Sequence, residues 1–293
     1  MFTQFFGNYL LNKRLVSPEQ LSEALSVLKT TRVKLGVLAI NAGYMTAEQV
    51  ERVHAEQQRV DKRIGEIAVD MGFMTGDQVE KLFSQQSGTH LILGQALVDK
   101  GYMTNSRFEE ALNSYKNENS LSDSDFKDND NEKIQQVIRS FYDFDDSDDE
   151  LMVEYIDLLF KNIVRFIGDD FMPMNCEKIT EYSFANAGVQ HINGEFSCTS
   201  SIDAEDAAYI EFGSRYAGEQ LTAVDEMADA CAGEFLNLHN GLFAVNVSND
   251  TGRELRLEPQ QVLRGETLTG MVDTYKIPLI FPFGTITFII GNY

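Results

Sequence analysis

Two polar side chains three residues apart, Glu234 and Asn237, are the strongest candidates for chemistry in this sequence. Residues at positions i and i+3 of a helix share one face, so a carboxylate and a carboxamide would project from it together. A carboxylate takes charge-assisted hydrogen bonds from cations, and a carboxamide donates and accepts hydrogen bonds at once. The spacing alone does not single out this pair, because Glu110 and Asn113 repeat it elsewhere in the chain.

A helix must carry the pair, and the surrounding sequence predicts one over Glu219–Val247. Gly233 and Gly241 flank the pair, and we expect them to permit close helix packing. His239 and Asn240 follow the pair and are predicted to face solvent. The stretch has no proline, and its apolar residues recur at helical spacings: Leu221, Val224, Met227, Ala228, Cys231, Phe235, Leu238 and Leu242.

The rest of residues 150–293 supplies a layer for this helix to pack on. An amphipathic helix is predicted over Leu151–Val164, because its apolar residues recur at helical spacing. Strand-like patterns follow in four segments, which are Gly188–Thr199, Ala207–Arg215, Glu254–Val262 and Lys276–Ile290. The sequence therefore predicts an α+β domain in which helices pack on an antiparallel sheet.

The first 116 residues are a repeat of period 29, with Gly7, Gly36, Gly65 and Gly94 opening four units. Each unit reads as two short helices. The first helix of a unit should end at a glycine in the left-handed conformation, at Gly43, Gly72 and Gly101. The first unit is degenerate, since Arg14 replaces that glycine.

The second helix of each unit should begin at a hydroxyl N-cap. Ser17, Thr46 and Thr75 each precede a glutamine by three residues, which is capping-box spacing, whereas Thr104 has Arg107 there instead. A pair of helices this short cannot bury its own apolar face, so the four units must pack on one another. We predict a compact all-helical domain.

Residues 117–149 read as an acidic linker with a short helix near Ile134–Phe144. The aspartate run that ends the linker, residues 145–150, has a calcium loop as its alternative interpretation. The run lacks the glycine and the distal glutamate of such a loop, so we expect a solvated tether. The domain organisation predicted from the sequence is thus 1–116, 117–149 and 150–293.

Composition excludes several classes of function. The 46 acidic residues against 24 basic ones give a net charge of −22, which argues against binding nucleic acid or anionic membranes. Three isolated cysteines indicate a reducing compartment, and the N-terminus lacks the pattern of a signal peptide, so a cytoplasmic protein is expected. The most apolar stretch, Ile277–Ile290, is too short and too interrupted to span a membrane.

Residues 150–293 resemble the CheX/CheC/FliY family of chemotaxis phosphatases. The resemblance rests on the Glu234 and Asn237 pair in a long helix, on Gly241 shortly after it and on Pro259 near the next strand. The opening helix of the domain is similar as well. One departure is Ala230, which stands where CheC and FliY have Asp or Ser four residues before the glutamate. The single copy of the motif is closer to CheX.

The resemblance implies a bacterial enzyme that hydrolyses the aspartyl phosphate of a CheY-like response regulator. Asn237 would orient the attacking water, Glu234 would bind a lysine of the regulator, and Mg2+ would be supplied mainly by the regulator. A homodimer is also expected, formed through an edge of the sheet near the strands that hold Phe281, Phe283, Ile286 and Phe288. The alternative is a non-catalytic signalling scaffold or adaptor.

The repeats resemble the N-terminal helical modules of type II secretion and pilus ATPases, in which such units can contribute to cyclic di-GMP binding. The units opening at Lys34-Leu35-Gly36 and Arg63-Ile64-Gly65 carry the resemblance, which makes Lys34 and Arg63 candidate nucleotide contacts. Ile92 departs from this pattern in the fourth unit. The other interpretation is a helical stack that serves protein contacts or dimerisation.

Overall fold

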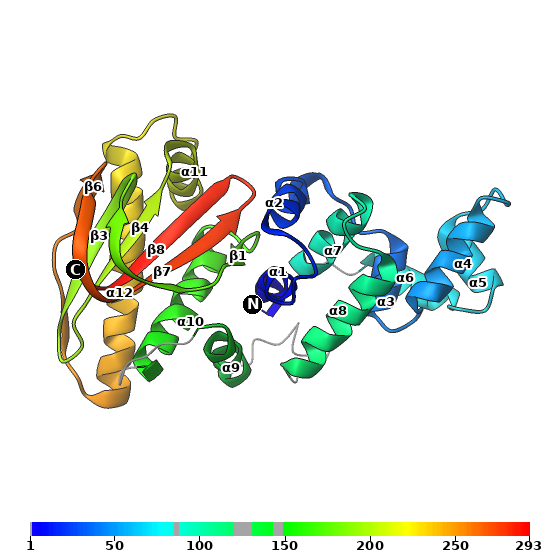
Figure 1. Cartoon of the computed structure of the whole chain (residues 1–293), viewed down its shortest axis with the longest axis horizontal. Helices are drawn as coiled ribbons and strands as arrows, with labels where there is room; N and C mark the ends of the chain where they lie inside the picture. Colours follow the sequence, from blue (N-terminus) through cyan, green and yellow to red (C-terminus); the bar gives the residue numbers. More distant parts are fainter. Residues whose placement is uncertain (1, 85–87, 120–130, 143–148) are drawn as a thin grey trace. The chain divides into compact units, whose positions relative to one another are not determined.

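A computed structural model describes residues 2–84, 88–119, 131–142 and 149–293 of the chain. The chain divides into two compact units, residues 2–129 and residues 130–293, and each is described by itself (Figure 1).

The N-terminal unit is all-helical. Its elements are α1 (Phe2–Asn12), α2 (Pro18–Ser26), a 3-10 turn η1 (Leu28–Thr30), α3 (Leu35–Asn41), α4 (Ala47–Gln57), α5 (Ile64–Asp70), α6 (Gly76–Ser84), α7 (Thr89–Asp99) and α8 (Asn105–Glu118). These elements form the four predicted pairs of helices, one pair for each repeat.

The opening glycines of the second, third and fourth repeats are explained by packing within the pair. A Cβ added at Gly36 would lie 2.7 Å from Val50, and one added at Gly65 would lie 2.9 Å from Val79. A Cβ at Gly94 would come closer still to the ring of Phe108. In each case the clashing side chain stands 14 residues later, on the second helix of the same unit. The repeat therefore conserves one close helix–helix contact.

The predicted starts and stops of these helices are confirmed. Ser17 and Thr46 each accept a hydrogen bond from the backbone N–H three residues on, and the glutamine there closes the capping box. Gly43, Gly72 and Gly101 have φ values of 67°, 75° and 73°. Arg14, which replaces the glycine in the first unit, takes the same left-handed conformation with φ 54°. The degenerate unit thus keeps the turn without the residue that favours it.

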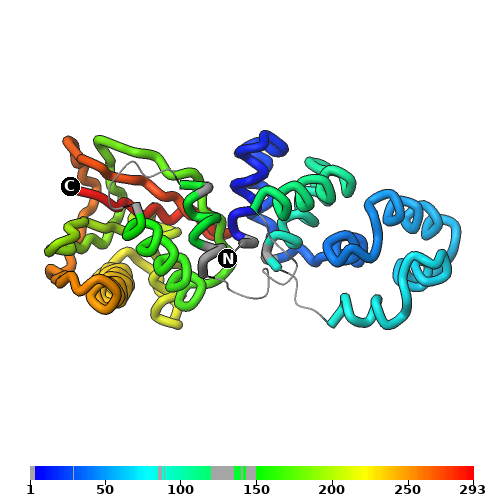
Figure 2. The backbone as a smooth tube through the Cα atoms, turned by 90° about the horizontal axis from the view of Figure 1, so that it is seen from below, coloured from blue at the N-terminus to red at the C-terminus, as the bar shows by residue number. Residues whose placement is uncertain are grey.

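The units do not stack in chain order. Helix α7 of the fourth unit packs on α1 and α2 of the first and on α3 of the second, while α5 packs on α4. Figures 1 and 2 both show α5 at the end of this unit away from α1. Phe6, Phe108 and Tyr115 form an aromatic cluster where the first and fourth units meet. The repeats thus form a compact domain, as predicted.

In its described residues, the C-terminal unit combines four helices with an antiparallel sheet of eight strands, so the α+β prediction is confirmed. Its helices are α9 (Asn131–Phe141), α10 (Asp149–Phe166), α11 (Asp206–Ala217) and α12 (Glu226–Thr251). Its strands are β1 (Met172–Pro173), β2 (Glu177–Ser183), β3 (Asn186–Gly194), β4 (Cys198–Ala204), β5 (Leu255–Leu257), β6 (Gln261–Arg264), β7 (Thr267–Phe281) and β8 (Gly284–Asn292).

The strand order is β1-β7-β8-β4-β3-β5, with β2 also paired to β7 and β6 to β3. Helices α11 and α12 cover one face of this sheet, and α10 packs beside α12 (Figure 1). Helix α12 approaches β3 closely because Gly188 has no side chain: a Cβ there would lie 3.1 Å from that of Ala232. A smaller apolar cluster contains Phe184, Val189 and Met271.

One predicted strand is wrong. The segment Ala207–Arg215 lies within helix α11. Ala208, Tyr209, Phe212 and Gly213 are buried, which is the spacing of one helical face rather than of a strand. The helix then ends at a glycine with φ 71°, Gly218, as a helix C-terminus favours.

The sheet edge expected to mediate a homodimer is also misplaced. Strand β8 pairs with β4 on one side and β7 on the other, so it lies inside the sheet. Phe281, Ile286 and Phe288 are buried, and Phe283 stacks on Phe281 under the guanidinium of Arg215. Phe281, Ile286 and Phe288 therefore form core, and Phe283 is half-buried. The homodimer itself stays a prediction.

Part of the predicted linker is helical, because α9 lies within it. This helix packs on α10 within the C-terminal unit. The aspartate run lies mostly outside the described residues, so its interpretation as a tether stays a prediction. Across the described ranges, no helix has the length and apolar character needed to cross a bilayer. The three cysteines are free, and burial raises the pKa of the Cys176 and Cys198 thiols to about 12.

Candidate functional site

Helix α12 is fixed at both ends. The Asp225 side chain accepts hydrogen bonds from the backbone N–H groups of Met227 and Ala228, at 3.1 and 3.2 Å. The helix therefore begins at Glu226, seven residues later than predicted, and it ends at Gly252 with φ 75°. The candidate pair lies near the middle of the helix, where fraying does not reach.

Glu234 and Asn237 of α12 are both accessible to solvent, to different extents. Glu234 is exposed and Asn237 is half-buried, whereas Phe235 and Leu236 between them are fully buried against the sheet. The structure therefore presents the carboxylate and the carboxamide together on an accessible helix face.

A shallow pocket of about 390 Å³ lies beside Glu234. Its lining includes three acidic residues, the residue just before β6 and the first two residues of β6: Glu226, Asp229, Glu234, Gln260, Gln261 and Val262. Glu234 has no hydrogen-bond or ion-pair partner within the described parts of the chain. Burial, and next the charge of Glu234, raise the pKa of Tyr216. The pocket suits a cationic group.

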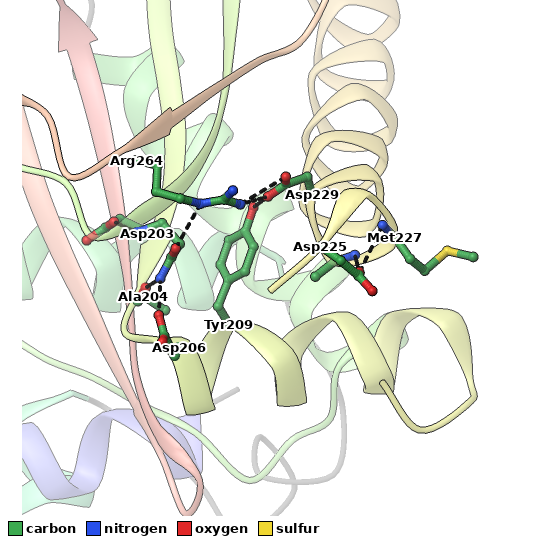
Figure 3. A network of polar contacts seen from close by, with 10 residues as sticks. Asp203, Ala204, Asp206, Tyr209, Asp225, Met227, Asp229 and Arg264 are labelled. Atoms are coloured by element: carbon green, nitrogen blue, oxygen red, sulfur yellow. Dashed lines mark hydrogen bonds and ion pairs between the residues drawn. The ribbon is translucent and has the colours of Figure 1, made fainter. Parts of the chain in front are cut away.

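One carboxylate of this pocket is already neutralised. Arg264 of β6 donates to both carboxylate oxygens of Asp229, at 2.8 and 3.0 Å, and Tyr209 donates to one of them at 3.3 Å. Figure 3 shows these three side chains converging from β6, α12 and α11. Arg264 also donates to Asn186 of β3 at 3.2 Å. The network ties the first turns of α12 to the sheet and leaves the charge of Glu234 uncompensated.

Asn237 is held from beneath by a residue that the sequence did not single out. Gln190 of β3 is buried, and its Nε2 donates to Oδ1 of Asn237 at 3.0 Å and to the backbone oxygen of Glu258 at 3.0 Å. The only sequence signal was a glutamine inside an apolar strand segment. The carboxamide of Asn237 is thus oriented by the sheet.

His239 and Asn240 do not face solvent, so that prediction is wrong. Both are fully buried. Asn162 lies 3.1 Å from Nδ1 of His239, and the ring of Tyr155 packs edge-on against the imidazole. Burial lowers the pKa of His239 to about 3. These residues join α12 to α10 and the sheet, and they do not form part of the open face.

The other motif positions serve packing or line a cavity. A Cβ on Gly233 would lie 3.4 Å from Gln260, an ordinary van der Waals contact, so the predicted packing role of this glycine stays a prediction. Ala230 lines the pocket beside Glu234. Pro259 lines a second cavity of about 360 Å³, together with Gln190 and His191. In the described ranges, no cluster of three or more His, Cys, Asp or Glu side chains is arranged to hold a metal ion.

Lys34 and Arg63, the candidate nucleotide contacts, both lie in the N-terminal unit. Each is the N-cap of the first helix of its repeat, α3 and α5 respectively. The Lys34 ammonium forms an ion pair with Asp99 at 2.6 Å, and its backbone N–H donates to Gln95 at 3.0 Å. Arg63 is exposed. A nucleotide would therefore have to compete with Asp99 for Lys34.

No protein-family model and no curated protein matches this chain. Several solved structures are similar to its C-terminal half. A CheC-like superfamily protein from Shewanella is 21% identical, covers 48% of this chain and 96% of its own, and has a TM-score of 0.42. The chemotaxis protein CheX from Desulfovibrio desulfuricans is 15% identical, covers 48% of this chain and 97% of its own, and has a TM-score of 0.41. A chain of a CheX–CheY complex with beryllium fluoride and magnesium from Borrelia burgdorferi is 15% identical, covers 48% of this chain and 96% of its own, and has a TM-score of 0.42.

Proposed function

We propose that the C-terminal unit is a response-regulator phosphatase of bacterial chemotaxis or two-component signalling, which hydrolyses the aspartyl phosphate of a CheY-like protein. The observation that supports this most is the presentation of Glu234 and Asn237 on one accessible face of α12, while the residues between them are buried.

The reaction requires the enzyme mainly to position a water molecule and to neutralise charge. An aspartyl phosphate is a reactive acyl phosphate, so its hydrolysis needs an in-line water and neutralisation of charge more than a protein nucleophile. Asn237 orients that water through its carboxamide. Glu234 forms a charge-assisted contact with a lysine of the regulator. The Mg2+ of the reaction belongs to the phosphorylated regulator and enters with it.

The surroundings of the pair suit a protein partner. Met227 and Val262 are exposed beside the pocket, and Leu242 and Val245 are exposed further along α12. Exposed apolar side chains gathered around a functional group are typical of docking surfaces. The solved CheX–CheY complex holds a partner of the class that we propose for this chain.

The experiment is to follow the decay of a phosphorylated CheY-type regulator with Mg2+ present. Wild type should accelerate the decay, Asn237→Ala should abolish the acceleration, and Glu234→Ala should raise the KM for the regulator. Asn113→Ala is the matched control, because Glu110 and Asn113 have the same spacing on α8 and both are exposed. If wild type accelerates the decay of no regulator from the same genome, the scaffold or adaptor alternative replaces this proposal.

A further inference from the structure

The orientation of the Asn237 carboxamide follows from a chain of three buried or half-buried amides. Gln190 donates through Nε2 to Asn237 and to the backbone oxygen of Glu258. Its Oε1 accepts from Nδ2 of Asn240 at 2.9 Å. Asn240 in turn donates to the Ser200 hydroxyl at 3.0 Å. The chain runs from the core of the unit to the open face of α12.

One backbone atom fixes the direction of every hydrogen bond between these three amides. The carbonyl oxygen of Glu258 can only accept, so the NH2 group of Gln190 must face it. The oxygen of Gln190 then faces Asn240, which must donate to it. The same NH2 group faces Asn237, which must present its oxygen. Reversing any one of these amides would place two donors or two acceptors against each other in a buried site.

The hydroxyl of Tyr155 supports this polarity from the other end, since it donates to Oδ1 of Asn240 at 2.7 Å. Both hydrogens of the Gln190 amide have acceptors, in Asn237 and Glu258, and both hydrogens of the Asn240 amide have acceptors, in Gln190 and Ser200. The Nδ2 group of Asn237 has no hydrogen-bond partner in the described parts of the chain. It is the one amide nitrogen of the three that is free to meet a ligand.

We propose that Gln190 is a positioning residue, which locks Asn237 with its NH2 group toward the substrate. This inference rests on the proposed function and adds a direction to it. The two N–H donors of Asn237 face the phosphoryl oxygens, and the remaining lone pair of Oδ1 accepts a hydrogen from the attacking water. Gln190 itself lies beneath the helix and touches neither.

The kinetic test uses Gln190→Met, which keeps the length of the side chain but removes both donors and the acceptor. We expect kcat for the regulator to fall about tenfold or more with KM nearly unchanged, since a reacting group misplaced by about 1 Å costs up to 10²-fold. Ser201→Ala is the control, because it removes a buried hydrogen bond of β4, to Tyr293, that does not reach Asn237. Gln190→Leu, which cannot donate to Asn237, is the second variant and should lose as much kcat.

A second readout does not depend on activity. In the side-chain amide NMR spectrum of wild type, the Gln190 protons should be protected from exchange with water and the Asn237 protons should exchange freely. Protected Asn237 protons, or a folded Gln190→Met variant with wild-type kcat, would overturn the positioning role. If wild type dephosphorylates no regulator but the exchange pattern holds, the proposed function fails while the orientation of Asn237 stands.

Discussion

The hydroxyl of Tyr155 on α10 donates a 2.7 Å hydrogen bond to Oδ1 of Asn240 on α12, and both side chains are buried. This bond joins the opening helix of the C-terminal unit to the helix that carries Glu234 and Asn237. Asn240 also contacts Ser200 on β4 and Gln190 on β3. A single carboxamide thus joins α10, α12 and the sheet.

Asn240→Ala should therefore destabilise the C-terminal unit by about 3 kcal/mol, because it leaves the Tyr155 hydroxyl and Oε1 of Gln190 buried without partners, at about 1–3 kcal/mol each. Urea unfolding followed through the methyl NMR signals of this unit measures the loss. Asn246→Ala, an exposed position on the same helix, is the control and should stay within about 0.5 kcal/mol of wild type. Equal effects of the two variants would contradict the network.

Burial of His239 predicts a dependence of stability on pH. The pKa of His239 is about 3 in the folded chain, below the value of about 6.5 expected when it is unfolded. Between these values the unfolded chain binds a proton that the folded chain does not, so stability falls as pH is lowered. His239 should cost the C-terminal unit about 2 kcal/mol between pH 7 and pH 5.

The variant His239→Gln removes this titration, so its free energy of unfolding should vary less between pH 7 and pH 5 than that of wild type. The comparison must follow signals of the C-terminal unit, because burial also lowers the pKa of His90 in the N-terminal unit to about 3. An unchanged difference between the two pH values in the variant would rule out His239 as a source of the acid sensitivity.

The left-handed turn at Arg14 predicts a stabilising substitution. A residue with a Cβ pays about 1–2 kcal/mol in this conformation, which glycine avoids, although glycine loses more entropy on folding. Arg14→Gly should raise the stability of the N-terminal unit by about 1 kcal/mol, measured by urea unfolding through signals of α1 and α2. Gly43→Ala, at the matching turn of the second unit, should lower it. A destabilised Arg14→Gly variant would mean that the arginine makes contacts worth more than the strain.

If Lys34 contacts a nucleotide, Asp99 should weaken the binding of that nucleotide. The Lys34 ammonium is 2.6 Å from this carboxylate, so a phosphate that binds Lys34 must displace it. Asp99→Asn should tighten the binding of cyclic di-GMP, and Lys34→Ala and Arg63→Ala should weaken it, as measured by isothermal titration calorimetry. If neither wild type nor Asp99→Asn releases heat, the repeats do not bind this nucleotide.

The sequence was most informative where structure is local. The caps at Ser17 and Thr46 and the turns at Gly43 and Gly72 depend on residues a few positions apart, so their spacing predicts them. The helix that carries Glu234 and Asn237 was predicted for the same reason. Its start was placed too early, because the apolar Leu221 and Val224 continue the helical spacing past the Asp225 cap.

Long-range contacts could not be predicted in this way. His239 and Asn240 are polar and follow the candidate pair, so solvent exposure was the natural expectation. They are buried because Tyr155, Asn162 and Gln190, which lie 50 to 85 residues away along the chain, supply their hydrogen bonds. Helix α11 was missed because its small and aromatic residues fit a strand as readily as one face of a helix.

Asn237 is proposed to act on the phosphoryl group of a response regulator. The most direct test is the decay of a phosphorylated CheY-type regulator with Mg2+ and an excess of this chain, comparing wild type with Asn237→Ala. Wild type should accelerate the decay, and the variant should leave it at the spontaneous rate. Equal acceleration by both proteins would contradict the role of Asn237, and acceleration by neither would contradict the phosphatase itself.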